Sequence, residues 1–491
     1  MKLSQLLERV SVSAVLGDPS VEITAVTADS RLVTRGALFA AIPGFKRDGS
    51  AFIASALEKG AAAIVTESVP AGWSGEAVLV DVADSREALA HIAASFHGHP
   101  AESMQIVGVT GTSGKTTTTK MLESVFDATG EPVGLIGTIE YRAGDEKLVA
   151  DRTTPDAVVL QDWFARMVRA GVRRAVMEVS SHALALRRTH GVKFAAAVFT
   201  NLSRDHFDFH KDFEDYFAAK KMLFDQIDRS RQTAIINIDD DYGRRLALEL
   251  GPAALTFGRT TDAAIHPAPY FEVSVGGLHG DLETPAGTIR MESHLLGAPN
   301  LYNWMGAIGA AIVLGIDGQT IEKGVRDLAA VRGRFEQVPN EDGPTIIIDY
   351  AHKPDALEKL LNTVRAIAGE RRVVLVIGCG GDRDQGKRSE MGAIAGKLAD
   401  YTLLTSDNPR SEKPETILDD IERGMAGVDG SRYLRISDRR AAIQRAIGDG
   451  TSDDVIVIAG KGHETYQVVG DQVVHFDDRE EAELALKMRS A

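Results

Sequence analysis

The feature that most constrains this chain is the glycine-rich segment Gly108-Val109-Thr110-Gly111-Thr112-Ser113-Gly114-Lys115-Thr116-Thr117. An apolar run at 104–109 predicts a buried strand before it, and the pattern from Thr116 onward predicts a helix that ends at Gly130. At a strand-to-helix turn of this kind, backbone N–H groups and the helix N-terminus bind anions. Lys115 can reach the outer phosphates of a nucleotide, and the Thr116 hydroxyl can bind Mg²⁺. The segment therefore predicts a nucleoside-triphosphate site in an α/β sheet.

The segment is a variant of the general phosphate-loop pattern, because Val109 stands at the position of the first glycine. The alternative is an ordinary glycine-rich turn with an exposed lysine. We favour the nucleotide site, because a Gly-Lys-Thr-Thr tetrad between a strand and a helix has little packing value of its own.

Composition limits the class of protein. The net charge of −15 argues against nucleic acid or an anionic membrane as the main partner. The single cysteine, Cys379, excludes an intramolecular disulfide and fits a reducing cytosol. The first residues do not resemble a signal peptide, and no run of about 18 apolar residues is present. We expect a cytoplasmic protein that binds no nucleic acid and does not insert into a membrane.

The length of 491 residues and the alternation of strands with helices predict three α/β domains. A smaller domain at 1–98 has strand-like runs at 21–27, 37–42 and 61–65 and a helical run at 51–58. A central domain at 99–335 has a mostly parallel sheet of the phosphate-loop type, with a short β insertion at 252–292. A Rossmann-like sheet is expected in the last domain, at 336–491.

Polar residues follow several predicted strands of the central domain. Glu178, Ser180 and His182 follow one strand, and the segment 201–208, which contains His206, follows the next. Since ligands bind beyond the carboxyl ends of parallel strands, these side chains suggest a metal–nucleotide site. For His206 alone a structural role is equally plausible, but its Asp-His-Phe-Asp setting favours function. In the next helical run, the pattern by itself favours Lys220 and its neighbour Lys221 as surface charges.

Four strands of the last domain lead into polar loops at 349–354, 378–384, 406–410 and 460–464. Loops that follow parallel strands lie at one edge of the sheet, which predicts a binding face there. The glycine-rich turn at 378–381 has the wrong spacing for a dinucleotide fingerprint, so we do not expect an NAD site.

Together these motifs resemble the Mur ligase family, the ATP-dependent amide-forming enzymes of peptidoglycan precursor synthesis. The resemblance extends over all three predicted domains and is carried by Gly111 to Thr117, Met177 to His182, Asn201 to His206, Ala219-Lys220, Asn300 with Asn303, Gly333 to Phe335, Asp349 to His352, and Asp407 to Arg410. It implies roles in cell wall biogenesis, cell shape and cell division.

Within the family, the chain is most similar to members that add meso-2,6-diaminopimelate to the D-Glu γ-carboxylate of UDP-N-acetylmuramoyl-L-Ala-D-Glu. The resemblance implies that ATP first phosphorylates this carboxylate and that the amine of diaminopimelate then attacks the acyl phosphate. It also implies Mg²⁺ as cofactor, ATP as co-substrate and a monomer whose partners are small-molecule substrates. The general base for the amine is not identified, although His352 is a candidate.

The resemblance also implies site residues. The catalytic residues would be Lys115, Glu178, His206 and Lys220, and the metal would be bound by Thr116, Glu178, His206 and a carbamylated Lys220. ATP would contact Gly111, Thr112, Ser113, Gly114, Lys115, Thr116, Thr117, Asn300, Arg334 and Asp349. The UDP-muramoyl dipeptide would contact Ser30, Phe45, Lys46, Arg47, Thr153, Thr154, Ser180 and Arg188. Diaminopimelate would contact Arg383, Asp407, Asn408, Pro409, Arg410, Gly460 and Glu464.

Arg410 is the residue on which the amino-acid specificity depends. Diaminopimelate is lysine with an additional carboxylate at its far end, and a guanidinium can bind a carboxylate through two hydrogen bonds. Lysine-adding members lack this arginine, which disfavours a lysine-adding ligase. The whole N-terminal domain disfavours a folylpolyglutamate-like ligase. A different alternative is a regulatory ATPase without ligase activity. A third is a scaffold protein, but a scaffold role would leave the acidic residues at the strand ends unexplained.

Overall fold

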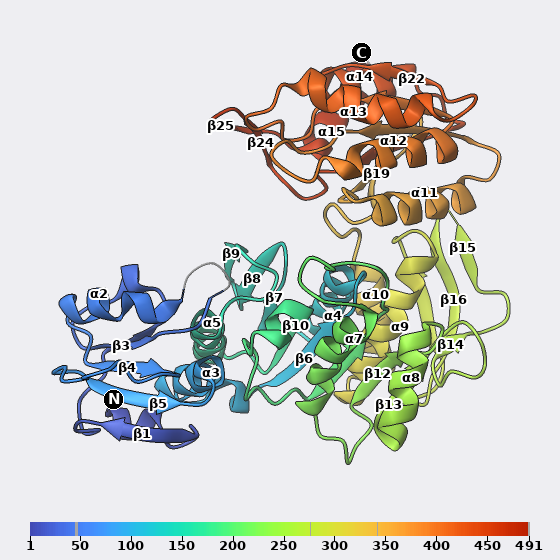
Figure 1. Ribbon diagram of the computed structural model, residues 1–491. Helices are drawn as coiled ribbons and strands as arrows, with labels where there is room; N and C mark the ends of the chain where they lie inside the picture. The colour runs from blue at the N-terminus through green and yellow to red at the C-terminus, as the bar shows by residue number, and fades with distance from the viewer. Residues whose placement is uncertain (45–47, 275, 341, 490–491) are drawn as a thin grey trace. The chain divides into compact units, whose positions relative to one another are not determined.

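The computed structural model describes residues 1–44, 48–274, 276–340 and 342–489. The chain divides into two compact units, which are described separately. The first unit comprises residues 1–266, 284–287 and 303–324, and the second comprises residues 267–283, 288–302 and 325–491. Figure 1 follows the chain from blue at the N-terminus to red at the C-terminus.

The N-terminal part of the first unit is a five-stranded sheet. Its order is β1 (Val12–Leu16), β5 (Val78–Val82), β4 (Ala63–Thr66), β3 (Ala37–Ala40) and β2 (Ala25–Thr27), with β1 antiparallel to the rest. The helices are α1 (Leu3–Leu6), α2 (Ile53–Glu58) and α3 (Ser85–Phe96). Leu38 and Phe39 belong to separate apolar clusters, because successive side chains of a strand point to opposite faces. The sheet is therefore buried on both faces, as in the predicted α/β domain.

The rest of the first unit is built on an eight-stranded sheet (Figure 1). Its order is β13 (Ala254–Phe257), β12 (Ala234–Asn237), β11 (Ala196–Phe199), β6 (Gln105–Thr110), β10 (Arg174–Glu178), β7 (Val133–Ile136), β8 (Glu140–Ala143) and β9 (Glu146–Val149). The pairs from β13 to β7 are parallel and the last two are antiparallel. The strand before the phosphate loop thus lies inside the sheet, between β10 and β11.

Helices alternate with these strands, as the sequence predicts. They are α4 (Lys115–Ala128), α5 (Ala157–Arg169), α6 (Ser181–Ala185), α7 (Phe213–Lys221) and α8 (Asp241–Leu250). Two further helices, α9 (Ala298–Val313) and α10 (Gly318–Asp327), come after the β insertion and each includes residues of both units. The predicted β insertion is also confirmed. Its strands are β14 (His266–Pro267), β15 (Glu272–Ser274), β16 (Gly277–Glu283) and β17 (Ile289–Ser293).

The C-terminal part of the second unit is a six-stranded sheet. Its order is β18 (Glu336–Val338), β19 (Thr345–Asp349), β23 (Asp454–Ala459), β20 (Arg372–Ile377), β21 (Tyr401–Leu404) and β22 (Tyr433–Arg435), with only β18 antiparallel. The helices are α11 (Pro354–Ala368), α12 (Gly386–Leu398), α13 (Pro414–Ala426), α14 (Arg439–Asp449) and α15 (Asp478–Arg489). A hairpin of β24 (Tyr466–Val469) and β25 (Gln472–His475) follows β23.

The four polar loops predicted for this region follow β19, β20, β21 and β23, which are neighbours and parallel. They therefore meet at one edge of the sheet, as expected. The predicted α/β fold class is confirmed. Within the described parts of the chain, no helix combines the length and the apolar character that crossing a membrane requires.

Candidate active site

The phosphate loop, residues 111–114, needs glycine at both ends. Gly111 has φ +149° and Gly114 has φ +89°, which are backbone conformations that other residues rarely adopt. A Cβ at Gly111 would lie 1.8 Å from Oγ1 of Thr200, and one at Gly114 would lie 2.4 Å from Oδ1 of Asn303. The loop therefore packs directly against the residue that follows β11 and against α9, and α4 begins at the next residue.

The residues after β11 fix the backbone of the phosphate loop. The Ser113 N–H donates to Oδ1 of Asn201 at 3.0 Å, and Thr200 Oγ1 donates to the Ser113 carbonyl at 2.6 Å. Lys115 Nζ donates to the carbonyls of Gly111 and Thr112 at 2.8 and 2.9 Å. The ammonium thus lies against its own loop, at the N-terminus of α4, where a phosphate would be bound.

Two residues predicted to bind the metal are in contact. Thr116 Oγ1 donates to Oε2 of Glu178 at 3.0 Å. Glu178 is 1% exposed and accepts two further hydrogen bonds, from N–H and Oγ1 of Thr138 at 2.7 and 3.0 Å. A carboxylate and hydroxyl groups are hard oxygen donors of the kind that Mg²⁺ prefers. The donors present here therefore fit Mg²⁺.

Lys220 is buried, unlike the surface charge that the helical pattern favours by itself and in keeping with the site role that the family resemblance implies. It is 1% exposed, and its Nζ donates to the Gly111 carbonyl at 2.7 Å and lies 4.3 Å from the centre of the Tyr216 ring. Burial, followed by the charge of Lys115, lowers the pKa of Lys220 well below its ordinary value. The helical pattern could not predict this, because the loop that covers Lys220 lies 109 residues earlier in the chain. Lys221 forms a partly exposed ion pair with Glu249.

His206 has a left-handed backbone, with φ +57°. Its Nε2 lies 3.4 Å from Oδ2 of Asp205, and its ring centre lies 4.7 Å from that of His182. Within the described residues, neither His206 nor Glu178 belongs to a group of three acidic, histidine or cysteine ligands whose atoms all lie within 4.8 Å. The structure thus joins Thr116 to Glu178 and Lys220 to the phosphate loop, and it places His206 in a cluster of aromatic rings.

Four of the residues predicted for the UDP-muramoyl dipeptide form one cluster. Thr154 Oγ1 donates to the Glu178 carbonyl at 2.8 Å and accepts from the Ser180 N–H at 3.1 Å. Arg188 Nη1 donates to the Thr154 carbonyl at 2.8 Å, and the hydroxyls of Thr153 and Thr138 lie 3.1 Å apart. The cluster is therefore continuous with the Glu178 carboxylate.

The remaining residues predicted for this substrate belong to the N-terminal sheet region. Ser30 begins a short 3-10 helix, Ser30–Leu32, and its carbonyl accepts from Lys59 Nζ at 2.7 Å. Phe45, Lys46 and Arg47 lie outside the described residues.

In the second unit, the loop of residues 407–410 surrounds a buried lysine. Lys461 is 0% exposed, and its Nζ lies 3.5 Å from Oδ1 of Asp407, 3.3 Å from Oδ1 of Asn408 and 3.3 Å from Oε2 of Glu464. Asn408 Nδ2 also donates to Glu464 at 2.9 Å. Three residues predicted to bind diaminopimelate thus share one cation that the sequence analysis did not select.

The β24–β25 hairpin holds the same loop from outside. Gln467 Nε2 donates to the Asp407 carbonyl at 2.7 Å, and the Val468 N–H donates to Oδ1 of Asn408 at 3.0 Å. The Arg410 N–H donates to the Val468 carbonyl at 3.0 Å. Arg410 itself has φ +52°, so these bonds stabilise a backbone conformation that is unfavourable for a non-glycine residue.

The Arg410 side chain lies beside the loop after β20. Its Nη1 donates to the Gly381 carbonyl at 2.8 Å. A Cβ at Gly380 would lie 2.9 Å from Arg410 Nη1 and 3.8 Å from Cγ of Arg383, which is exposed. Arg383 and Arg410 therefore both lie near Gly380.

Asp349, the last residue of β19, is hydrogen-bonded to three segments of the chain. Its carboxylate accepts from the N–H groups of Phe335 and Ala351, both at 2.8 Å, and its carbonyl accepts from the Gly460 N–H at 3.0 Å. Burial raises the pKa of Asp349, and the charge of Arg334 opposes this shift. Arg334 stacks 5.0 Å from the ring centre of Tyr350. Two residues predicted to bind ATP, Arg334 and Asp349, are therefore neighbours.

Asn300, also predicted to bind ATP, belongs to the second unit and donates to the Leu296 carbonyl at 2.8 Å. Asn303, three residues later on α9, belongs to the first unit and lies against Gly114. Asn303 belongs to the same sequence motif as Asn300, but the sequence predicts no ligand for it. The available signals were its spacing of three residues from Asn300 and, for Lys461, the Gly-Lys-Gly sequence.

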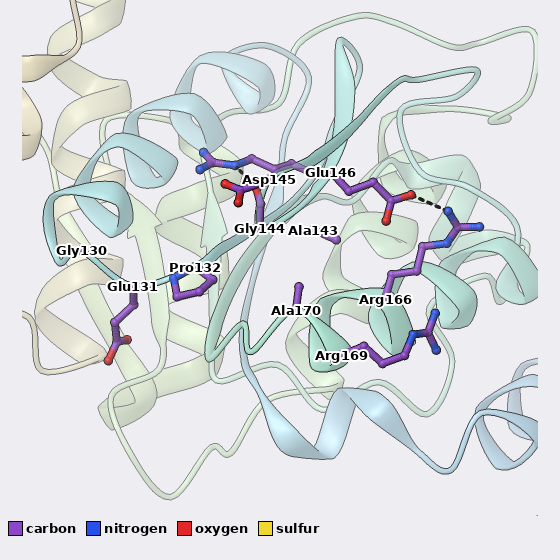
Figure 2. A pocket seen from close by; sticks show the side chains of 11 residues that line it. Gly130, Glu131, Pro132, Ala143, Gly144, Asp145, Glu146, Arg166, Arg169 and Ala170 are labelled. Atoms are coloured by element: carbon purple, nitrogen blue, oxygen red, sulfur yellow. Dashed lines mark hydrogen bonds and ion pairs between the residues drawn. The ribbon is translucent and has the colours of Figure 1, made fainter.

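A cavity of about 630 Å³ lies away from these residues, between the end of α5 and the β8–β9 edge (Figure 2). Its walls include Arg142, Arg166 and Glu146, and Arg166 Nη1 lies 2.7 Å from Glu146 Oε1. None of the predicted site residues lines it. Arg142 pairs instead with Glu123 and Asp127, which do not line the cavity. We assign the cavity no role in the site.

Three family models match the chain. The model described as "Mur ligase family, catalytic domain" matches residues 22–97, "Mur ligase middle domain" matches 109–311, and "Mur ligase, glutamate ligase domain" matches 333–462.

Similar full-length proteins share one name, UDP-N-acetylmuramoyl-L-alanyl-D-glutamate–2,6-diaminopimelate ligase. The protein of Geobacter metallireducens is 41% identical, over 100% of this chain and 99% of the relative. The protein of Geobacillus thermodenitrificans is 44% identical, over 100% of both chains. A solved structure of the same name is 31% identical, covers 100% of this chain and 99% of its own, and superposes with a TM-score of 0.73.

Proposed function

The chain belongs to the Mur ligase family, and we propose that it joins meso-2,6-diaminopimelate to UDP-N-acetylmuramoyl-L-alanyl-D-glutamate with consumption of ATP. The product is an amide at the γ-carboxylate of the D-glutamyl residue, an intermediate of peptidoglycan synthesis. We also propose that residues 1–98 bind the UDP-muramoyl dipeptide, residues 99–335 bind ATP and residues 336–491 bind the amino acid. We further propose that the protein is a cytoplasmic monomer whose partners are only small molecules.

The observation that carries the amino-acid specificity is that a guanidinium and a carboxylate both belong to the surroundings of the 407–410 loop. The far end of diaminopimelate carries a carboxylate and an ammonium, whereas that of lysine carries only an ammonium. Arg410 offers a guanidinium and Glu464 a carboxylate, and Asn408 links the loop to Glu464 at 2.9 Å. Within the described residues, the hydrogen bonds of the Arg410 side chain all come from Nη1, so Nε and Nη2 can bind a carboxylate.

The first step requires transfer of the γ-phosphoryl group of ATP to a carboxylate oxygen. Lys115, the N–H groups of the phosphate loop and the N-terminus of α4 stabilise the negative charge on the phosphates. Thr116 and Glu178 would hold Mg²⁺ together with His206 and a carbamylated Lys220, and the bound ion would neutralise further charge on the phosphate oxygens.

Carbamylation of Lys220 is consistent with its surroundings. The lowered pKa favours the neutral amine, whose lone pair can form an N–C bond with CO₂. The amine loses one proton in this reaction, and a buried carbamate with one negative charge results. A group of this charge beside Lys115 and the phosphate loop would offer an oxygen ligand where the unmodified lysine offers none.

The second step requires a neutral amine. His352 is suited to accept its proton, because burial lowers the pKa of the ring and keeps it neutral at pH 7. Its Nδ1 lies 2.9 Å from the Tyr350 carbonyl and donates to it, which leaves the lone pair on Nε2. Attack of the amine then gives a tetrahedral intermediate from which phosphate leaves.

The experiment measures phosphate release from Mg-ATP and UDP-N-acetylmuramoyl-L-Ala-D-Glu, with meso-diaminopimelate or L-lysine as the amine. We expect phosphate release that depends on diaminopimelate. In Arg410→Ala, kcat/KM for diaminopimelate should fall about 10- to 150-fold, because hydrogen bonds between charged groups are lost. The matched control is Arg423→Ala, since Arg423 is an exposed arginine of α13 that pairs with Asp420.

Two outcomes would contradict the proposal in different ways. Equal turnover with L-lysine would overturn the amino-acid specificity but leave a ligase. Phosphate release without any amine would instead support a regulatory ATPase.

A further inference from the structure

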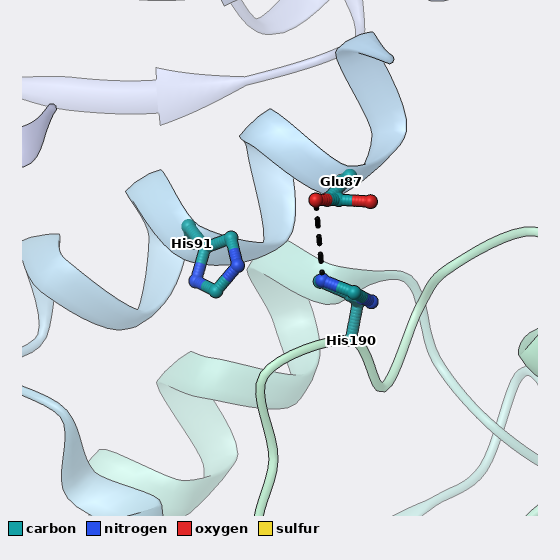
Figure 3. Close-up of side chains that lie close together, drawn as sticks. All are labelled: Glu87, His91 and His190. Atoms are coloured by element: carbon teal, nitrogen blue, oxygen red, sulfur yellow. Dashed lines mark ion pairs between the residues drawn. The ribbon is translucent and has the colours of Figure 1, made fainter. Parts of the chain in front are cut away.

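Three metal-binding side chains meet in the first unit, outside the candidate active site (Figure 3). Glu87 and His91 lie four residues apart on α3, so they project from the same face of that helix. His190 comes from the segment between α6 and β11. One ligand atom from each residue lies within 4.8 Å of the other two, and Glu87 Oε1 lies 3.5 Å from His190 Nε2.

The donor set favours a particular class of metal ion. Two imidazoles and one carboxylate suit Zn²⁺ and similar transition-metal ions, whereas Mg²⁺ and Ca²⁺ prefer sites made entirely of oxygen. In a tetrahedral Zn²⁺ site with bonds of about 2.0–2.2 Å, neighbouring ligand atoms are about 3.3 Å apart. The Glu87–His190 pair already has this spacing, and rotation of half-buried side chains could bring His91 into place.

The surroundings hold the ligands near one another. A Cβ at Gly191 would lie 3.1 Å from Cε1 and 3.2 Å from Nδ1 of His91, so the backbone of this glycine, at φ +78°, packs on the ring. The His91 and His190 rings meet edge to face, with their centres 5.1 Å apart. About one helical turn before Glu87, Asp84 caps α3, and its Oδ2 lies 3.7 Å from Nε of Arg187. This ion pair also joins α3 to the segment that carries His190.

We infer that Glu87, His91 and His190 form a binding site for a transition-metal ion of the Zn²⁺ class, with water as a fourth ligand. The ion would connect α3, which follows the five-stranded sheet, to the segment that precedes β11 in the eight-stranded sheet. Since it would bind the folded chain and not the unfolded one, it would stabilise this connection.

The test uses the full-length protein without an affinity tag, freed of metals by a chelator and held in excess Mg²⁺ to occupy oxygen-rich sites. Zn²⁺ affinity is measured by competition with a chromophoric chelator, and Co²⁺ is added separately because its visible absorption reports tetrahedral coordination. The variants are His190→Ala, His91→Gln and Glu87→Gln. His475→Ala is the control, because His475 pairs with Glu480 outside any three-ligand group of the described residues.

We expect one tetrahedral Co²⁺ site in the wild type and a loss of Zn²⁺ affinity of at least tenfold in each of the three variants, with none in the control. Zn²⁺ should also raise the melting temperature of the wild type more than that of Glu87→Gln, whose shape is nearly unchanged. Equal affinity and equal spectra in the wild type and all three variants would overturn the inference. A further variant, His206→Ala, tests the other location. If the Co²⁺ bands disappear only in that variant, the metal lies among the aromatic rings around His182 and the inference is overturned.

Discussion

The phosphate loop of the first unit and the 407–410 loop of the second both follow a parallel strand, but they are held by different means. Residues 111–114 are held by glycine conformations, the start of α4 and the residues after the adjacent strand β11. Residues 407–410 are held by Lys461 and by the β24–β25 hairpin, about 50 to 60 residues later. A phosphate can be bound largely by backbone groups, whereas an amino acid with charges at its far end requires side chains brought from several strands.

The largest expected effect is a loss of stability in Lys461→Met, which should affect the 407–410 loop and leave the phosphate loop unchanged. This change removes a buried cation and leaves Asp407 and Glu464 without their shared partner, at a cost of about 3–5 kcal/mol. Hydrogen exchange read by mass spectrometry should show faster exchange in peptides of 401–475 and unchanged exchange in 105–128.

The control is Lys397→Met, because Lys397 is exposed in the same unit. It should change stability by no more than about 0.5 kcal/mol. Equal protection of the 401–475 peptides in Lys461→Met and the wild type would show that this loop does not depend on the buried cation.

A slightly smaller effect, on activity alone, is expected for Lys115→Met. The ammonium lies on the phosphate loop, and its loss should lower kcat about 10²- to 10³-fold, the size found when one stabilising donor is removed. The fold should remain, because the loop is also held by Thr200 and Asn201. Steady-state phosphate release measures this, with the exposed Lys147→Met as control. If the variant retains more than a tenth of the wild-type kcat, Lys115 does not stabilise the phosphates as proposed.

An acid-dependent loss of stability of up to about 3 kcal/mol is expected from His463, in the second unit. Burial, followed by the charges of Arg334, Arg332 and His352, lowers the pKa of His463 to about 4. The folded state therefore favours the neutral ring, and its contribution to stability is present above the unfolded pKa of about 6.5 and is lost as the pH falls toward 4. His463→Gln should weaken the pH dependence of exchange in 454–475 between pH 7 and 5. An unchanged slope would contradict this assignment.

The smallest effect is expected for Gln467→Ala, which removes one hydrogen bond to the Asp407 carbonyl. A neutral hydrogen bond of this kind is worth about 0.5–1.5 kcal/mol, so KM for diaminopimelate should rise about 2- to 10-fold with KM for ATP unchanged. Gln472→Ala, on the exposed second strand of the hairpin, is the control. A parallel rise in both KM values would show that the hairpin does not act through the 407–410 loop alone.

The sequence by itself determined the elements that depend on local pattern. The strand before the phosphate loop, the helix after it, the short β insertion and the four polar loops of the last sheet are all present as predicted. Glycine spacing and apolar periodicity report backbone conformation directly, and parallel strands bring the following loops to one edge.

Only the tertiary structure decided which polar side chains are buried together. Lys220 appears solvated in the helical pattern, yet a carbonyl 109 residues earlier in the chain covers it. Lys461 is central to the 407–410 loop, and Glu87 and His190 meet across about 100 residues of chain. No local pattern reports such contacts, because the cost of burying a charge and the groups that offset it depend on strands and helices that come together only in the folded chain.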